Sequence, residues 1–266
     1  MLARGLLEDV YQHYHYDFRA YAPSSLRRRL AVALQQLGCR SLRELKEQAL
    51  GDPAVFSGLL EVLTVQLSDL FRDPQYFRAL RAEVAPLLRT YPSIKVWIAG
   101  CSSGEEVYSF AILLHEEGLL DRSIVYATDI NPGALRKAEL GVYDLSRVAG
   151  FTENHRRSGA SSSLSDYYNT GYGKAIFAKW LRSNVVFADH SLATDSVFSE
   201  VHYVSCRNVL IYFDRILQDR ALGLFSDALC RKGFLGLGSK ESLRFSQVSD
   251  SFADFDAAHR IYQKRY

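Results

Sequence analysis

The stretch from Lys95 to Phe110 restricts the possible folds of this chain more than any other. Its first part, residues 94–99, is a short apolar run with β-branched and aromatic side chains, which is typical of a buried strand. Gly100 and Gly104 then enclose a turn of small residues, and apolar side chains recur at helical spacing after the turn. A strand, a glycine-rich turn and a helix in this order predict the opening unit of a nucleotide-binding α/β fold.

Acidic residues near this turn indicate the kind of ligand. Glu105 and Glu106 directly follow the second glycine and would repel a phosphate, so they favour a ligand with positive charge and hydroxyl groups. Residues 123–128 predict a second buried strand that ends in Asp129, where such folds hold a ribose diol. The turn lacks the G-x-G-x-x-G pattern, so S-adenosylmethionine fits better than a dinucleotide. The alternative is a generic α/β fold in which the glycines serve only the turn and the acids cap the helix.

Composition excludes several classes of protein. The 266 residues are 48% hydrophobic, and a formal net charge of +2 gives no general attraction to nucleic acid. The four cysteines are widely separated and include no C-x-x-C pair, so we expect no metal site, no disulfide framework and a reducing, cytoplasmic setting. Because the chain has no apolar run of about 18 residues, we also expect no membrane insertion.

Residues 1–62 are predicted to form a small helical domain. Pro23 and Pro53 each mark a helix start, and Ser41 begins a capping-box pattern for the helix between them. The helix that begins at Pro23 contains three consecutive basic residues, which are Arg27, Arg28 and Arg29. Consecutive residues fan around a helix, so the three cannot all be buried. They form either a solvated face or a docking patch for an acidic helical partner.

The rest of the chain is predicted to add a linker and a large α/β domain. Residues 63–92 form the linker and a helix that begins at Asp73-Pro74 and contributes to the cofactor site. Residues 93–266 alternate strands with helices and end in an apparent hairpin, which predicts a mixed seven-stranded sheet. Residues 143–182 are predicted to form a small surface subdomain, because residues 150–172 are rich in Ser, Gly, Asn and Tyr with little periodicity.

Taken together, these segments resemble the chemoreceptor glutamate methyltransferase (CheR-type) family over essentially the whole chain. The residues that carry the resemblance are 16–19, 25–30, 70–74, 100–106, 108–109, 127–130 and 206–213. The resemblance implies an N-terminal all-helical domain followed by a Rossmann-like methyltransferase domain. It implies that S-adenosylmethionine gives its methyl group to a glutamate carboxylate of a chemoreceptor-like protein, leaving a glutamyl methyl ester and S-adenosylhomocysteine. The implied partner is an acidic helical segment, docked on Arg27 to Arg29 of a cytoplasmic monomer.

The resemblance also implies roles for individual residues. Arg72 would lie near the ligand's carboxylate and the methyl-transfer centre, and Tyr212 would face the reacting methyl group. Glu106 would accept from the ligand's ammonium group, and Asp129 from its ribose hydroxyls. The other residues implied at the cofactor are Gln66, Ser68, Gly100, Ser191, Leu192, Arg207 and Asn208. No metal is implied.

The chain departs from the family pattern at several positions, which suggests a divergent member. Gln66 and Ser68 stand where the family has Asn and Thr, Ser191 stands in place of Asn, and Lys240 interrupts a G-H-S-E motif. One alternative is therefore a ligand-binding regulatory or scaffold protein with little transferase activity, and another is a methyltransferase for a different acidic substrate. The residues that favour the glutamate methyltransferase by being retained are Arg72, Glu106, Asp129 and Tyr212.

Overall fold

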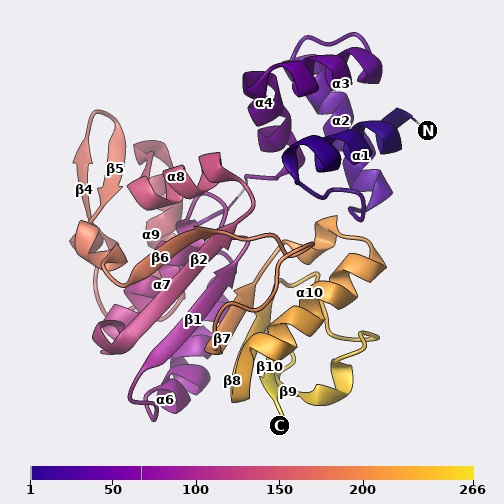
Figure 1. Cartoon of the computed structure of the whole chain (residues 1–266). Helices are drawn as coiled ribbons and strands as arrows, with labels where there is room; N and C mark the ends of the chain where they lie inside the picture. Colours follow the sequence, from indigo (N-terminus) through magenta and orange to yellow (C-terminus); the bar gives the residue numbers. More distant parts are fainter. Residues whose placement is uncertain (1, 67) are drawn as a thin grey trace.

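The computed structural model of this protein describes residues 2–66 and 68–266, so Met1 and Leu67, which fall within the predicted helical domain and linker, lie outside the described residues. The N-terminal part is all-helical, as predicted (Figure 1). Its helices are α1 (Leu2–Tyr14), α2 (Pro23–Gln36), α3 (Leu42–Gly51) and α4 (Pro53–Leu63). They enclose a core of their own, in which Leu6, Phe18, Leu45 and Leu59 are fully buried.

Side-chain caps begin two of the predicted helices, α3 and α4. Ser41 accepts a hydrogen bond from the backbone N–H of Glu44 at 3.2 Å, and Asp52 accepts one from the N–H of Ala54 at 2.8 Å. The α2 helix has no side-chain cap at Ala22. Instead, the N–H of Ala22 donates to the carbonyl of Tyr212 at 2.8 Å, which ties the start of α2 to the other half of the chain.

The second part contains the mixed seven-stranded sheet that the sequence predicts, in the order β6-β2-β1-β7-β8-β10-β9. Its strands are β1 (Ile94–Ala99), β2 (Ser123–Asp129), β6 (Val185–Asp189), β7 (Val201–Cys206), β8 (Leu229–Leu237), β9 (Phe252–Asp256) and β10 (Ile261–Lys264). From β6 to β8 neighbouring strands are parallel, whereas β10 is antiparallel to both β8 and β9. The result is a Rossmann-like fold.

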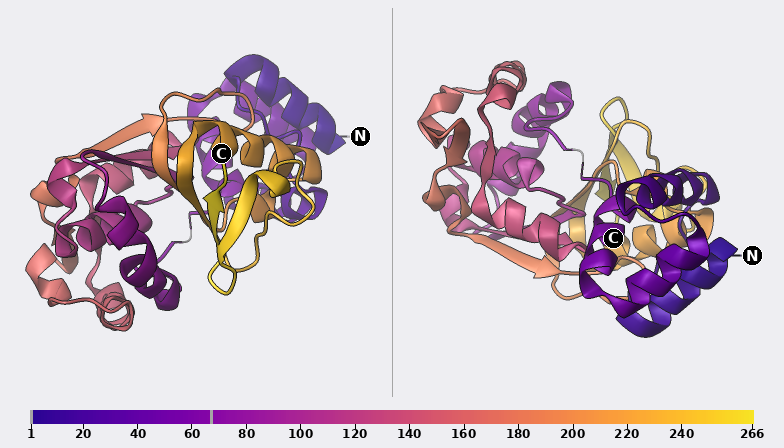
Figure 2. Two further views of the ribbon diagram at one scale, coloured as in Figure 1. Left: turned by 90° about the horizontal axis from the view of Figure 1, so that it is seen from below. Right: turned by 90° about the horizontal axis from the view of Figure 1, so that it is seen from above.

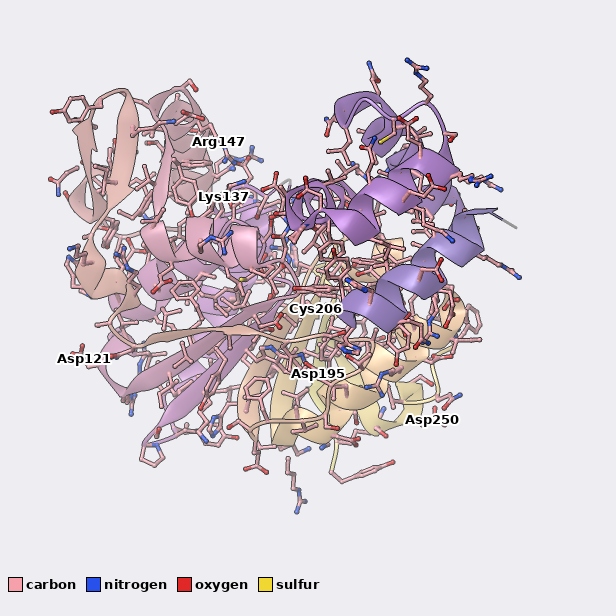
Figure 3. All side chains as sticks on the ribbon, turned by 45° about the horizontal axis from the view of Figure 1, so that its top comes forward. Asp121, Lys137, Arg147, Asp195, Cys206 and Asp250 are labelled. Atoms are coloured by element: carbon pink, nitrogen blue, oxygen red, sulfur yellow. The ribbon has the colours of Figure 1, made fainter. Side chains whose placement is uncertain are left out.

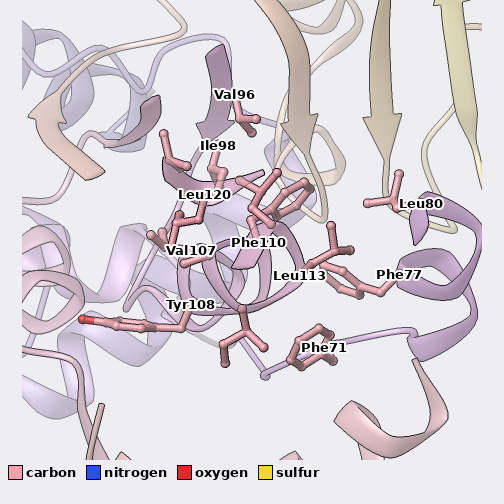
Figure 4. Packing of buried hydrophobic residues seen from close by; sticks show 14 of the residues in the cluster. Phe71, Phe77, Leu80, Val96, Ile98, Val107, Tyr108, Phe110, Leu113 and Leu120 are labelled. Carbon is pink, nitrogen blue, oxygen red and sulfur yellow. The ribbon is translucent and has the colours of Figure 1, made fainter. Parts of the chain in front are cut away.

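Helices cover both faces of this sheet (Figures 1 and 2). They are α5 (Pro74–Ala79), a π-helical turn (Leu80–Val84), α6 (Ala85–Leu88), α7 (Glu105–Glu116), α8 (Pro132–Leu140), α9 (Val148–Arg157) and α10 (Arg215–Ala228). Short 3-10 turns span Leu120–Arg122, Leu145–Arg147, Leu164–Tyr167, Lys179–Arg182, Leu210–Tyr212 and Ser249–Ser251. Alternate residues of β1 enter different cores, because strand side chains point to opposite faces. Val96 and Ile98 pack with Phe71 and Phe110 (Figure 4), whereas Trp97 packs on the α10 side.

A second sheet is formed by the part of the chain between β2 and β6, although these two strands are neighbours in the main sheet. It consists of β3 (Val142–Asp144), β4 (Tyr168–Gly171) and β5 (Lys174–Phe177) in the antiparallel order β3-β5-β4, and it lies on the side away from the N-terminal helices (Figure 2). Although the sequence of residues 150–172 shows little periodicity, α9 continues to Arg157 within them. Only Val148, Phe151 and His155 of α9 are buried. The buried face of this helix is therefore narrow, and its helical periodicity is weak in a sequence that is otherwise mostly polar.

The sequence also predicts a helix from Arg215 to Arg231 that ends at Lys232-Gly233, followed by a strand from Phe234 to Leu237, and the structure moves both boundaries. The α10 helix ends at Ala228 rather than at Arg231, and β8 begins at Leu229 rather than at Phe234. Lys232 has a left-handed φ of 64°, and the register of β7 against β8 shifts there. The Lys-Gly pair therefore marks a β-bulge and not a helix end, since both devices use the same left-handed backbone.

Among the helices that residues 2–66 and 68–266 form, none combines the length and the apolar character needed to cross a lipid bilayer.

Candidate functional site

A pocket lies at the carboxyl ends of β1, β2, β6 and β7. The chain adds β2 and β6 on one side of β1 and then crosses to β7 on the other side, so the strand order reverses between β1 and β7. The loops that leave these two strands diverge, and the crevice between them is where open α/β sheets bind ligands. The turn after β1 and the loop after β7 both line the pocket.

The structure brings all of the predicted cofactor and catalytic residues to the wall of this one pocket. They are Gln66, Ser68, Arg72, Gly100, Glu106, Asp129, Ser191, Leu192, Arg207, Asn208 and Tyr212. The predicted docking residues lie elsewhere: Arg27 and Arg28 are exposed on α2, and Arg29 is partly buried there. Lys240 is exposed and does not line the pocket.

Asp129 ends β2 and is buried at the pocket. Its carboxylate oxygens accept the backbone N–H groups of Ser102 at 2.8 Å and Asn131 at 2.9 Å, so one side chain fixes both the glycine-rich turn and the start of α8. Burial raises the pKa of Asp129, and these hydrogen bonds only partly offset that effect. Because a carboxylate has about four lone-pair positions, Asp129 can accept further hydrogen bonds from a diol.

Gly100 allows the turn after β1 to approach the loop after β7. It has a left-handed φ of 74°, which strains any residue with a β-carbon. A β-carbon at this position would lie 2.6 Å from Cγ2 of Val209. The N–H groups of Gly100 and Cys101 both donate to the carbonyl of Thr128 at 2.8 Å, which holds the turn against β2.

Replacing Gly100 with alanine is expected to lower the free energy of unfolding by about 1–3 kcal/mol, because the methyl group would both strain φ and overlap Val209. Urea denaturation measures this change. The matched control is Gly223→Ala in α10, where a β-carbon meets nothing within 4 Å and where alanine should stabilise the helix by about 1 kcal/mol. Equal stabilities for the two variants would contradict the close approach at Gly100.

Charged side chains join α7 to the loop after β7. Arg207 donates to Glu106 Oε2 at 3.0 Å and to Asp73 Oδ2 at 2.7 Å. It also donates to the carbonyl of Arg72 at 3.0 Å, and its side chain is only 1% exposed. Ser205 donates to the other oxygen of Glu106 at 2.6 Å. Glu106 lines the pocket, and its carboxylate has about four lone-pair positions, so it can accept from a ligand ammonium group as well as from Arg207 and Ser205.

The expectation that Glu105 belongs with Glu106 at the ligand is wrong. The Glu105 side chain is buried outside the pocket, where it accepts from Arg147 at 2.7 Å and from Ser103 at 2.7 Å. Successive residues of a helix point about 100° apart, and here Glu106 faces the pocket while Glu105 is turned toward Arg147. Figure 3 shows Arg147 on the same side of the molecule as Lys137 of α8, whereas Cys206 of β7 lies near the centre.

The backbone on both sides of Arg72, which lines one wall of the pocket, is strained. Phe71 and Asp73 flank Arg72 and have left-handed φ values of 50° and 58°, which are uncommon for residues other than glycine. The hydroxyl of Ser109 accepts the N–H of Phe71 at 2.7 Å, and Asn154 donates to the carbonyl of Leu70 at 3.0 Å. Backbone strain that neighbouring groups hold in place is typical of functional sites.

Several residues of the pocket were not predicted. Some, such as Ser102, only adjoin predicted residues, but Tyr21 comes from the N-terminal helical part and carries no motif. Tyr21 forms an isolated antiparallel bridge with Phe213, and their ring centroids lie 5.0 Å apart. A contact between segments so distant in the sequence leaves no local signal.

The turn after β6 contains two buried polar atoms that need partners. Across the described part of the chain, nothing forms a hydrogen bond with Nδ1 of His190 or Oγ of Ser191. Both residues line the pocket beside the apolar Leu192 and Ala193. Leaving buried polar atoms unpaired costs free energy, so this end suits a flat apolar ligand with polar edges, such as adenine. Together with the acidic groups of the pocket, these residues fit an S-adenosyl ligand.

Within residues 2–66 and 68–266, no group of three or more His, Cys, Asp or Glu side chains is placed to hold a metal ion.

The sheet order, the glycine-rich turn and the acid at the end of β2 define a Rossmann-like methyltransferase. More specifically, the chain belongs to the CheR methyltransferase family. The family model "CheR methyltransferase, SAM binding domain" matches residues 66–261, and "CheR methyltransferase, all-alpha domain" matches residues 4–64.

Curated relatives match most of this chain. The protein Cher3 of Pseudomonas putida is 56% identical over 261 residues, covering 98% of this chain and 96% of that protein. Chemotaxis protein methyltransferase 2 of Pseudomonas aeruginosa is 31% identical over 222 residues, with 80% of this chain and 76% of that protein covered. The chemotaxis protein methyltransferase of Listeria innocua is 29% identical over 229 residues, covering 85% of this chain and 84% of that protein.

Proposed function

We propose that this protein transfers a methyl group from S-adenosylmethionine to a glutamate carboxylate of a chemoreceptor-like protein. The observation that carries the proposal is the meeting of Arg72, Glu106, Asp129 and Tyr212 in one pocket beside the strand-order reversal. Names of relatives such as chemotaxis protein methyltransferase support it. A receptor segment is then the partner, and S-adenosylhomocysteine is the product.

In this proposal different residues of the pocket bind different parts of the ligand. Asp129 accepts from the ribose hydroxyls, and Glu106 accepts from the ammonium group while it stays paired with Arg207. Ser191 and Leu192 hold the adenine end, together with His190. The bound cofactor supplies an electrophilic methyl group on a sulfonium, which is a good leaving group.

Methyl transfer requires the protein to align the reacting groups, but it does not require a general base. A glutamate side chain has an ordinary pKa of about 4.3, so the acceptor is already ionised at neutral pH. Arg72 would hold that carboxylate, and Tyr212 would orient it through its hydroxyl. Holding the reacting groups in line in a pocket closed to water can supply roughly 7–11 kcal/mol of the barrier. No catalytic triad is therefore needed.

The first test is calorimetric titration with S-adenosylmethionine and S-adenosylhomocysteine, followed by assay of methyl ester formation on an acidic helical receptor fragment. Micromolar binding together with alkali-labile methylation of glutamate would support the proposal. Binding without ester formation on any receptor fragment would reject the acceptor, and failure to bind either ligand would reject the whole proposal.

The exposed arginines of α2 are proposed to dock the acceptor. Reversing two charges in Arg27→Glu/Arg28→Glu is expected to lower kcat/KM for receptor methylation by about tenfold or more at low salt, since electrostatic steering is lost. The dissociation constant of S-adenosylhomocysteine should not change, because neither residue reaches the pocket. Arg29 is left intact because its Nε atom is buried.

The matched control for this pair is Arg43→Glu, an exposed charge reversal on α3. It should leave methylation unchanged. If the α2 variant and the α3 variant behave alike, docking on α2 is refuted.

A scaffold protein that binds the ligand without transferring methyl groups is the second candidate. It is favoured by the departures at Gln66, Ser68 and Ser191, all of which line the pocket. Each keeps a polar group in place, and Gln66 Oε1 accepts from Ser102 at 2.9 Å. Ester formation on a receptor fragment would exclude this candidate.

A further inference from the structure

The loop after β7 carries Asn208 and Tyr212 into the pocket, and a carboxylate outside the pocket holds its backbone. Glu241 lies in the turn after β8, is 5% exposed and does not line the pocket. Its Oε2 accepts the backbone N–H of Asn208 at 2.9 Å and that of Gly238 at 2.7 Å. Its Oε1 accepts the N–H of Ile211, directly before Tyr212, at 3.3 Å.

These bonds stabilise a backbone conformation that the loop does not favour by itself. Asn208 has a left-handed φ of 61°, which costs free energy even though asparagine tolerates it better than most residues. Two of the loop's N–H groups point at the carboxylate, and hydrogen bonds to an ionised acceptor are stronger than neutral ones. Burial raises the pKa of Glu241, and the backbone N–H donors oppose that effect.

Gly238 makes the contact possible. A β-carbon at Gly238 would lie 2.7 Å from Oε2 of Glu241 and 2.8 Å from the N atom of Asn208. Only glycine lets the end of β8 approach both the carboxylate and the loop this closely. The turn after β8 is thus built around the loop that follows β7.

Other contacts fix the loop from the remaining sides. Val209 packs against Gly100, and the carbonyl of Tyr212 accepts from Ala22. These contacts reach only the middle and the end of the loop. Gln218 Nε2 donates to the carbonyls of Leu210 and Phe213 at 3.0 and 3.1 Å, whereas the Glu241 carboxylate holds the N–H groups of Asn208 and Ile211, and so helps to set the path between Arg207 and Tyr212.

We propose that Glu241 is a positioning residue, which sets Asn208 and Tyr212 against the ligand and the acceptor carboxylate without touching either. This inference rests on the proposed function for its catalytic consequence. Its structural consequence, a loop ordered by one carboxylate, does not depend on what the pocket binds.

The test replaces Glu241 with glutamine. An amide has one oxygen and one NH₂ group, so in either orientation at least one backbone N–H would face another donor. We expect kcat for receptor methylation to fall by about 10²-fold, as for a displacement of about 1 Å at a reacting centre, with a smaller rise in KM for the acceptor. Hydrogen–deuterium exchange should quicken in residues 207–213 and stay slow in β7 and β8.

Gly238→Ala disturbs the same contact from the other side and should give the same pattern of exchange and kinetics. Lys240→Gln, next to Glu241 but exposed, is the control and should change neither. Assays are run well below the thermal midpoint of each variant, so that global unfolding does not enter.

The outcomes separate the two proposals. Faster exchange across the whole sheet with unchanged kcat would mean that Glu241 only stabilises the fold, which would overturn the inference. Unchanged exchange in residues 207–213 would overturn it as well. If the unmodified protein binds no S-adenosylhomocysteine, the proposed function fails, and local exchange still decides whether Glu241 orders the loop.

Discussion

Replacing Asp129 with alanine is expected to raise the dissociation constant of S-adenosylhomocysteine by about 100-fold or more. In the proposed binding mode the variant would lose two charge-assisted hydrogen bonds to the ribose, each contributing roughly 1.5–3 kcal/mol. It also removes the acceptor for the N–H groups of Ser102 and Asn131, so the glycine-rich turn loses its anchor on β2. Isothermal titration calorimetry measures the change directly.

The matched control is Asp189→Asn. Asp189 ends β6, pairs in register with Asp129, and is exposed outside the pocket, so its loss should leave the dissociation constant nearly unchanged. If both variants bind as tightly as the unmodified protein, Asp129 does not hold the ribose and the orientation proposed for the ligand is wrong.

The pH dependence of binding provides a second signature of Asp129. Burial raises its pKa above the ordinary value for an aspartate, and ribose hydroxyls require the ionised form. Affinity should therefore fall as the pH decreases through that raised pKa, beginning at a higher pH than for an exposed carboxyl group. In the ligand-free protein the sign is opposite. The stability that Asp129 contributes is present below its unfolded pKa and is lost as the pH rises through its folded pKa.

Replacing Arg207 with methionine is expected to lower the free energy of unfolding by about 3–5 kcal/mol, the usual effect of removing one partner of a buried ion pair. The Arg207 side chain is 1% exposed, and the Glu106 side chain opposite it is 12% exposed. In the variant, solvation by water would therefore compensate the Glu106 carboxylate only weakly for the lost ion pair. The guanidinium also lies 4.0 Å from the ring centroid of Tyr76, and this cation–π contact would be lost. Urea denaturation measures the total.

A double variant separates the lost ion pair from lost packing. Arg207→Met/Glu106→Gln removes both charges and should recover part of the stability, which a double-mutant cycle quantifies. Arg215→Met, an exposed residue paired with Asp219 on α10, is the control and should cost less than about 1 kcal/mol. A loss below about 1 kcal/mol for Arg207→Met as well would show that the ion pair is not needed for folding.

Local patterns predicted the main elements because their causes are local. The run 94–99 became β1, the caps at Ser41 and Asp52 begin α3 and α4, and the alternation of strands and helices gave the mixed sheet. The errors have local causes too. The α9 helix was missed because its apolar stripe is narrow, and the bulge at Lys232 uses the same backbone conformation as a helix end.

The pocket was only partly predictable. Asp129 and the glycines follow from the spacing of a nucleotide-binding unit, and further members followed from resemblance to a family. Periodicity did not show that the Glu105 side chain points away from the pocket. Two adjacent acidic residues cannot be distinguished in the sequence, because the packing of α7 against the sheet decides which of them faces the ligand. Tyr21 had no signal at all, since its partner is the distant Phe213, and the motif that contains Glu241 did not show that its carboxylate accepts from Asn208.

The sequence by itself determined most of the strands and helices, where the glycine turn falls and which acid ends β2, because these depend on propensities and spacings within a few residues. Only the tertiary structure decided that α2 begins against Tyr212 and that a carboxylate after β8 shapes the loop after β7. Such contacts join residues far apart along the chain. They exist only once the parallel strands align their carboxyl ends along one edge of the sheet.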